Sequence, residues 1–319
     1  MLDKFWEAAG EKFADRWASV AAPAVFFWVG GALAWLWHDG GALNGLDHWA
    51  RRQSEITQLV VLLAVLTCVA ASGLLVQRLT APVLRLAEGY WPPVLGRASG
   101  RRVGAVRNRA ACLDERFQEL AGPVDSGTAT ARQRSEFADV DQRLRRFPAD
   151  GDYLPTRTGN VLRAAERRPG EKYGLDATVV WPRLWLLLPS DTRSEIAQAR
   201  SALDAAVTAV IWAFFFLGFS FLAFWAPIIT VGVIVVSCLY WIPGRAEVFA
   251  DLVEAAFDVY RLAVYEQLRW PLPANPQEEH ESGVRLTTYL LRGSDSPVPA
   301  FTRPAGRDKG EPAGGHHAP

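Results

Sequence analysis

The sequence predicts a mainly α-helical membrane protein with four transmembrane helices in two hairpins and a mostly helical cytosolic domain between the second and third spans. Half of the 319 residues are apolar and 21% are charged, yet long stretches carry no charge at all. Such stretches are typical of bilayer-spanning helices. Between them, apolar residues recur at the spacing of amphipathic helices. Thr178–Trp181 and Val284–Arg292 are candidate strands, so the prediction leaves room for a few short strands.

The first predicted hairpin covers residues 19–77. Ser19–Trp37 has 19 residues without an ionisable side chain, a length that crosses about 30 Å of hydrocarbon at 1.5 Å per residue. The alternative is a signal peptide cleaved after Ala34. We favour a retained span, because four acidic residues precede it where a signal peptide should be basic. Ile56–Gln77 is a second span of the same quality.

The second predicted hairpin covers residues 201–242. Its 38 residues from Ala205 to Ile242 carry no charge, and one helix of that length would measure about 57 Å. We therefore expect two spans that turn near residues 226–227, at Ala226–Pro227. We also expect Pro243–Gly244 to break the helix behind them.

The orientation follows from the arginines near the span ends. The turn at Pro227 is uncharged, whereas five arginines flank the other ends of spans two to four: Arg78, Arg85, Arg193, Arg200 and Arg245. By the positive-inside rule, the long loop and both termini face the cytoplasm, so we predict a multi-pass plasma-membrane protein. Arg51 and Arg52 in the first short loop oppose this topology, and the basic residues before span one offset them.

Two segments are predicted to lie at the membrane surface. Residues 1–18 form an amphipathic helix whose Trp6 and Trp17 suit the headgroup belt. After span two, Arg85, Tyr90 and Trp91 lead into six arginines between positions 97 and 116, including Arg101 and Arg102. We expect these arginines to attract anionic lipid. Nucleic-acid binding is the alternative, and the absence of interleaved aromatic residues argues against it.

The cytosolic domain is predicted to cover residues 78–200. Three helices are expected there: one with the stripe Val106, Ala110, Leu113, Phe117 and Leu120, one with Phe137, Val140, Leu144 and Phe147, and one over Gly159–Arg168 capped by Thr156 or Thr158. The start of the third could hold an anion with Arg157 and Asn160, although a plain capped helix is the preferred interpretation.

Ala177–Pro189 is the most unusual cytosolic segment. Its 13 apolar-rich residues include Arg183 and are too few to span a bilayer. We interpret it as domain core. The alternative is contact with the membrane or with a neighbouring subunit, and Trp181, Arg183 and Trp185 are therefore candidate partner contacts. A Thr192–Glu195 capping box predicts a cytosolic helix that continues unbroken into span three.

Residues 243–292 are predicted to form a cytosolic amphipathic helix and a short extension. The helix carries an apolar stripe that can cover the domain or pair with a partner helix: Phe249, Val253, Ala256, Tyr260, Val264 and Leu268. Residues 293–319 are rich in proline and glycine, and we expect them to be disordered.

The segments Pro155–Pro189 and Arg245–Pro273 resemble those of uncharacterised actinobacterial, Streptomyces-type multi-pass membrane proteins. The resemblance implies a plasma-membrane location and implies that the two segments form a linked unit. It implies no activity. A bacterial, GC-rich genome also agrees with 30 arginines among the 34 basic residues.

No nucleotide-binding, zinc-protease or hydrolase motif occurs, so we predict neither an enzyme nor a cofactor. The three cysteines have no metal or disulfide spacing, and we predict no metal site. The uncharged span cores argue against active transport. Small residues at steps of four predict close helix packing and a homo-oligomer: Ala64, Cys68 and Ser72 in span two, and Ala205, Ala209 and Ala213 in span three.

The leading functional hypothesis is a membrane-anchored scaffold or sensor whose cytosolic domain docks a protein partner. The alternative is an oligomeric channel gated by that domain and lined by hydroxyls such as Thr67, Ser72 and Ser237. A third class, a membrane-bound enzyme, would need acidic and hydroxyl groups clustered around Asn160 and Asp176.

Overall fold

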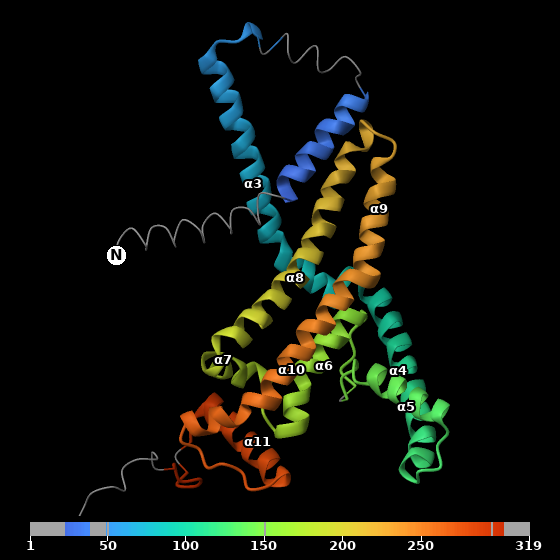
Figure 1. Ribbon diagram of the computed structural model, residues 1–319, viewed down its shortest axis with the longest axis vertical. Coiled ribbons are helices and arrows are strands. Elements are labelled where there is room, and N and C mark those ends of the chain that lie inside the picture. Colours follow the sequence, from blue (N-terminus) through green and yellow to red (C-terminus); the bar gives the residue numbers. More distant parts are fainter. Residues whose placement is uncertain (1–22, 39–48, 50, 150, 295, 303–319) are drawn as a thin grey trace, which may run out of the picture. The chain divides into compact units, whose positions relative to one another are not determined.

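The computed structural model describes residues 23–38, 49, 51–149, 151–294 and 296–302 (Figure 1). It is 82% helical and contains no strand among these residues, which confirms the mainly α class. The chain divides into two compact units. Unit 1 comprises the described residues of Met1–Val106, Leu154–Gly159 and Ala199–Glu247, and unit 2 those of Arg107–Tyr153, Asn160–Gln198 and Val248–Pro319. The long helices α8 and α10 contribute residues to both.

Both candidate strands are helical, so that prediction was wrong. Thr178–Trp181 lies in α7 (Ala177–Leu187), where the Asp176 carboxylate accepts a hydrogen bond from the Thr178 amide at 2.8 Å. Val284–Arg292 belongs to α11 (Pro276–Arg292), which the Asn275 side chain caps in the same way. Capping and the burial of one helical face outweigh the β propensity of the valine and threonine residues.

Unit 1 contains the first predicted hairpin. Residues 23–38 are helical, while the start of the first predicted span and the predicted surface helix 1–18 lie outside the described residues. The second span lies in α3 (Glu55–Glu88), which Ser54 caps and which continues through Pro82. It ends at Gly89, whose φ of 104° is a left-handed conformation that glycine adopts without strain. The short helix η1 (Pro93–Leu95) and the first third of α4 (Gly96–Asp125) follow.

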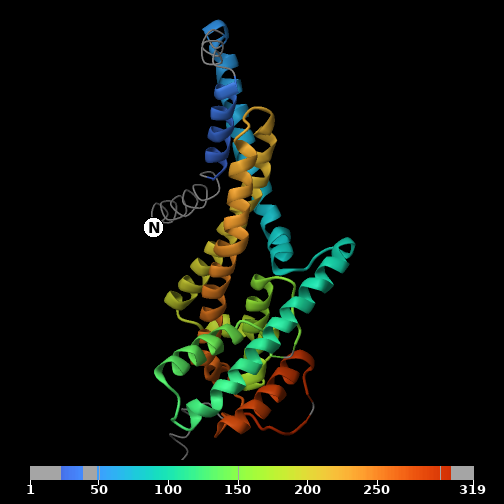
Figure 2. The same cartoon turned by 90° about the vertical axis from the view of Figure 1, so that its right-hand side faces the viewer.

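The second hairpin is formed by α8 (Ser190–Phe216), the short helix η2 (Leu217–Phe221) and α9 (Ala226–Val236). Figures 1 and 2 both show α8 and α9 side by side. Pro227 lies in the first turn of α9, so the chain reverses a few residues before the predicted position. Proline suits the first turn of a helix because the amide that it lacks would have no helical partner there. The buried Thr230 hydroxyl donates to the Ala213 carbonyl at 3.1 Å, which joins the two helices.

The predicted break at Pro243–Gly244 was also wrong. After α9 the chain makes a π-helical turn, η3 (Ser237–Trp241), and continues directly as α10 (Ile242–Gln267). The Ile242 amide bonds to the Ser237 carbonyl, five residues back. A proline cannot donate to the carbonyl four residues before it, and the wider π turn lets the helix absorb this defect without ending.

Among the described residues, three stretches contain helices long and apolar enough to cross a membrane: Glu55–Asp125, Ser190–Phe221 and Ala226–Gln267. Only 11%, 28% and 28% of their most apolar windows are buried within the protein. Because the chain itself covers so little of this apolar surface, a lipid environment is its natural complement.

Unit 2 is a helical domain with a hydrophobic core. Its members come from α7, α10, α11, the first turns of α8 and the residues that connect these helices: Leu175, Ala177, Val180, Leu184, Leu188, Ile196, Ala256, Phe257, Val264, Tyr265, Trp270 and Leu286. The apolar stripe predicted for residues 249–268 packs on this core, as expected for a helix that covers the domain.

Two of the predicted domain helices pack on each other within unit 2. The Phe117 ring of α4 stacks on the Phe137 ring of α5 (Ala131–Leu144) at 4.8 Å, and Leu120 and Val140 are buried. Phe147 was placed on the same helical stripe, but α5 ends before it. The third predicted helix is α6 (Arg157–Tyr173).

Candidate functional site

The start of α6 is a capped and closely packed junction within unit 1. The Thr156 hydroxyl accepts a hydrogen bond from the Gly159 amide at 3.0 Å, so Thr156 is the cap and Thr158, 4% exposed, is not. A Cβ atom on Gly159 would lie 1.8 Å from the Glu88 carbonyl oxygen at the end of α3. The carbonyl end of α3 therefore lies against the amide end of α6, where their partial charges attract.

This junction supports the capped-helix interpretation over an anion site. The backbone of α3 already lies against the first turn of α6. Arg157 forms an ion pair with Glu247 at 2.7 Å, and Asn160 is only 2% exposed. Arg157 is therefore engaged by a carboxylate, although its side chain is 54% exposed, and Asn160 is buried.

The segment around α7 belongs to the core of unit 2. Trp181 and Trp185 lie 5.7 Å apart between ring centroids, and Trp181 packs 5.8 Å from the core residue Phe257. Arg183 donates to the Val179 carbonyl of its own helix. These three candidate partner contacts are partly buried, whereas Leu186 on the outer face is 76% exposed.

A charge network that the sequence interpretation missed joins α6 to α10 in unit 2. Arg168 and Lys172 both bind the Glu254 carboxylate, with Lys172 Nζ at 2.6 Å. One residue further along α6, the Tyr173 hydroxyl donates to Asp258 Oδ1 at 2.6 Å. The only signal in the sequence was a pair of cations four apart on one helix and a pair of carboxylates four apart on another.

Arg261 extends the network to α11. Its guanidinium lies 4.0 Å from the centre of the Tyr173 ring, a cation–π contact, and its Nε donates to Glu279 Oε1 at 2.6 Å. The network therefore balances three cations against three carboxylates. Each charge has a partner, so the network suits a structural clamp between three helices.

The surroundings shift several ionisation equilibria in this network. Burial opposes the charge of Glu254, but hydrogen bonds from Lys172 and Arg168 outweigh it and lower the pKa of this carboxyl. Burial, followed by the hydrogen bond to Asp258, raises the pKa of Tyr173 to about 12. Burial also raises the pKa of Tyr265 to about 12.

The described membrane-surface candidates lie where α3 ends and α4 begins. The Arg85 guanidinium lies 6.0 Å from the Tyr90 ring centre, and the Trp91 indole donates to the Leu86 carbonyl at 3.0 Å. Arg101 and Arg102 are exposed on the first turns of α4. Val94, which lies between Trp91 and Arg101 in the sequence, is 89% exposed. Aromatic, aliphatic and basic side chains therefore share one short segment. Trp6 and Trp17 lie outside the described residues.

Only part of the predicted small-residue stripes packs within the chain. The Trp28 indole donates to the Ser72 hydroxyl at 3.2 Å, while Ala64 and Cys68 are exposed. Ala213 is buried against α9, whereas Ala209 is half-buried and Ala205 exposed. Outside these stripes, α3 contacts α8 through the hydroxyls of Thr80 and Thr208, which are 3.3 Å apart.

The outer face of α10 in unit 2 carries an exposed stripe that we name the α10 stripe. Its members recur at steps of three or four residues: Val248, Asp251, Ala255, Val259, Leu262 and Glu266. Val259 is 68% exposed, Val248 49% and Leu262 41%. The opposite face of the same helix packs on the core, whereas the side chains of the α10 stripe are exposed among the residues that the structure describes.

In the part of the chain that the structure describes, no three histidine, cysteine, aspartate or glutamate side chains come together as a metal site. No family model, curated protein or solved structure matches this chain.

Proposed function

We propose that this chain is a four-span protein of the bacterial plasma membrane, with both termini and unit 2 on the cytoplasmic side. Three membrane-length apolar stretches and the uncharged run Ser19–Trp37 support the four spans. The arginines at the span ends support the orientation. The exposed Tyr90, Val94 and Arg101 suit the lipid headgroup layer at the end of the second span. The resemblance to actinobacterial membrane proteins stays a prediction.

Within this topology, we propose that unit 2 is a scaffold or sensor domain that docks a protein helix on the α10 stripe. The carrying observation is the exposure of Val248, Val259 and Leu262 along one face of a helix whose other face fills the core. The acidic residue Glu266 is exposed in the same stripe. The partner that fits this surface is an amphipathic helix with an apolar stripe flanked by lysine or arginine.

Site-specific photo-crosslinking in native membranes tests the docking proposal. A photoreactive phenylalanine analogue at position 259 should capture one discrete cytosolic protein. When the analogue is placed at position 262 instead, it should capture the same protein, and this capture should fail when Val259→Asp removes the apolar centre of the stripe. The control is Leu291→Asp, because Leu291 is 60% exposed but lies on α11. An adduct of twice the mass of the chain would instead identify a second copy and contradict the scaffold.

The channel alternative predicts a different result. Several candidate pore hydroxyls donate to backbone carbonyls: Thr67 to Leu63, Ser72 to Val69 and Thr208 to Asp204. Packing therefore accounts for them without a water-filled pore. In a liposome flux assay we expect no ion leak above the lipid background. A leak that Ser72→Ala or Ser237→Ala alters would favour the channel.

A further inference from the structure

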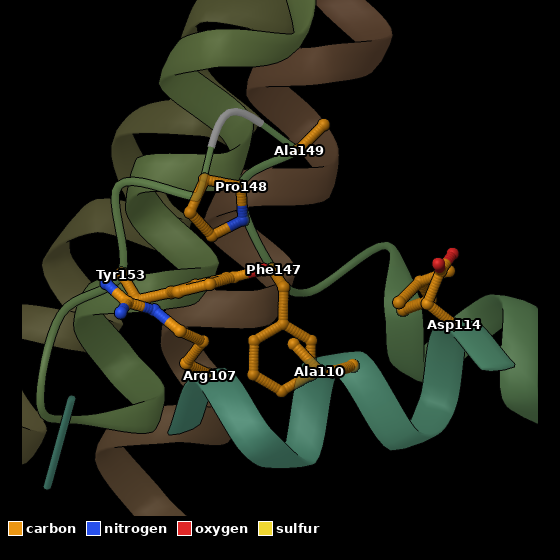
Figure 3. Close-up of a pocket in the computed structure, with 9 residues that line it drawn as sticks. Arg107, Ala110, Asp114, Phe147, Pro148, Ala149 and Tyr153 are labelled. Atoms are coloured by element: carbon orange, nitrogen blue, oxygen red, sulfur yellow. The ribbon is translucent and has the colours of Figure 1, made fainter. Parts of the chain in front are cut away.

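A pocket of about 420 Å³ lies in unit 2 between α4 and the chain that follows α5 (Figure 3). One face of α4 supplies Arg107, Ala110, Ala111 and Asp114. The end of α5 and the following loop supply the rest: Leu144, Phe147, Pro148, Ala149 and Tyr153. The volume falls within the range of about 300–1,000 Å³ that is typical of small-molecule sites. This pocket is separate from the α6–α10 charge network and from the α10 stripe.

The pocket is open because its helical wall is built from small residues. Positions 107, 110, 111 and 114 follow the spacing of one helical face, and the two in the middle are alanines. The Phe147 and Tyr153 rings meet edge to face with their centroids 6.2 Å apart, and Figure 3 shows the two side chains beside each other at the pocket. Together with Leu144 and Pro148, they give the pocket an apolar, aromatic wall.

The two ends of the pocket carry opposite charges. Within the described chain, Arg107 and Asp114 take part in no ion pair, unlike the paired charges of the α6–α10 network. They are two helical turns apart, about 10 Å along α4. A guanidinium presents a planar fork of donors that matches a carboxylate. A carboxylate at the other end repels a second anionic group there.

We propose that this pocket binds a small aromatic monocarboxylate. The carboxylate of the ligand pairs with Arg107, and its ring lies against Phe147 and Tyr153. The far end of the ligand, near Asp114, is neutral or cationic. Such a site gives the domain a ligand to sense, and it depends neither on the docking of a protein helix nor on the membrane topology.

Fluorine NMR on the full chain in detergent tests this proposal with 4-fluorophenylacetate as the probe. We expect saturable broadening and shift of the probe resonance. Arg107→Gln should weaken binding about tenfold, because it removes the partner of the carboxylate. The matched control is Arg109→Gln, since Arg109 is exposed on the same helix but does not line the pocket. It should bind as the native chain does.

Ala111→Leu provides the steric test. Ala111 is exposed and lines the pocket, so leucine fills the space without entering the core, and binding should be lost. Tyr153→Leu serves as a second variant if circular dichroism shows that the first has lost helix. A probe containing a second carboxylate, 1,4-phenylenediacetate, should bind more weakly than 4-fluorophenylacetate, and Asp114→Asn should remove that difference. Absence of saturable binding to the native chain, or binding by the Ala111→Leu and Arg107→Gln variants as tight as that of the native chain, would overturn the proposal.

Discussion

The Glu254 carboxylate binds two cations at once, and both come from α6. Its side chain is 14% exposed, so solvent screens these contacts far less than it screens a surface ion pair. Removing Glu254 leaves Arg168 without its carboxylate and leaves Lys172 with Asp258 alone, at 3.4 Å, and an uncompensated buried charge costs more than the cluster contributes as a whole. Glu254 is therefore the residue whose loss should loosen unit 2 most directly.

We predict that Glu254→Gln lowers the free energy of unfolding by about 1–2 kcal/mol, the usual cost of losing hydrogen bonds to charged groups. Thermal unfolding followed by circular dichroism in detergent checks this. Glu266→Gln is the control, because Glu266 is exposed on the same helix and should change stability by less than about 0.5 kcal/mol. Equal effects of the two variants would mean that the network is unimportant.

Tyr173 and Tyr265 predict how stability responds to alkaline pH. Burial raises the pKa of each phenol to about 12, and the hydrogen bond to Asp258 adds to the effect at Tyr173. The ordinary value is about 10. A pKa raised on folding contributes stability below the unfolded value, and this contribution is lost as the pH rises through the folded value. Helix content should therefore fall between about pH 10 and 12. Tyr173→Phe should reduce this pH dependence, and an unchanged curve would contradict the assignment.

Among the helices of unit 1, the end of α3 and the start of α6 approach each other closely. A Cβ on Gly159 would overlap the Glu88 carbonyl oxygen, which is backbone and cannot rotate away. A Cβ on Gly104 of α4 would meet no other atom within 4 Å. The same substitution in two helices should thus have opposite effects.

We predict that Gly159→Ala destabilises the protein by about 1–3 kcal/mol, because the two helices must separate. Gly104→Ala should stabilise it by about 0.5–1 kcal/mol, because alanine loses less backbone entropy on folding. Denaturation of both variants and of the native chain in detergent shows whether each substitution raises or lowers the free energy of unfolding. A neutral Gly159→Ala would show that the junction is looser than described.

Two helix boundaries differ from those that local sequence rules predict. Pro243 was expected to end a helix, and a π turn over Ser237–Trp241 carries the helix past it instead. The Thr192–Glu195 capping box was expected to start α8, which begins at Ser190. The expectation that α8 is continuous was nevertheless confirmed, since no proline or glycine interrupts it before Phe216.

For the molecule as a whole, the orientation can be tested with its own cysteines. The chain has three, and Cys112 lies exposed on α4 in unit 2. In a variant with Cys68→Ala and Cys238→Ala, a membrane-impermeant maleimide should label Cys112 in inside-out vesicles but not in intact cells. Labelling of intact cells would place unit 2 outside and reverse the proposed topology.

The sequence by itself determined the helical class and the apolar stretches that need lipid. Both depend on local patterns: a period of 3.6 residues and runs without charge. It also predicted the apolar stripe of α10 but left open whether this stripe covers the domain or pairs with a partner helix, and the structure places it on the core. The tertiary structure decided the partners of the polar side chains. Glu254 binds Arg168, 86 residues earlier in the chain, and the pocket joins Arg107 to Tyr153. Such contacts depend on how distant helices pack, and no local period records them.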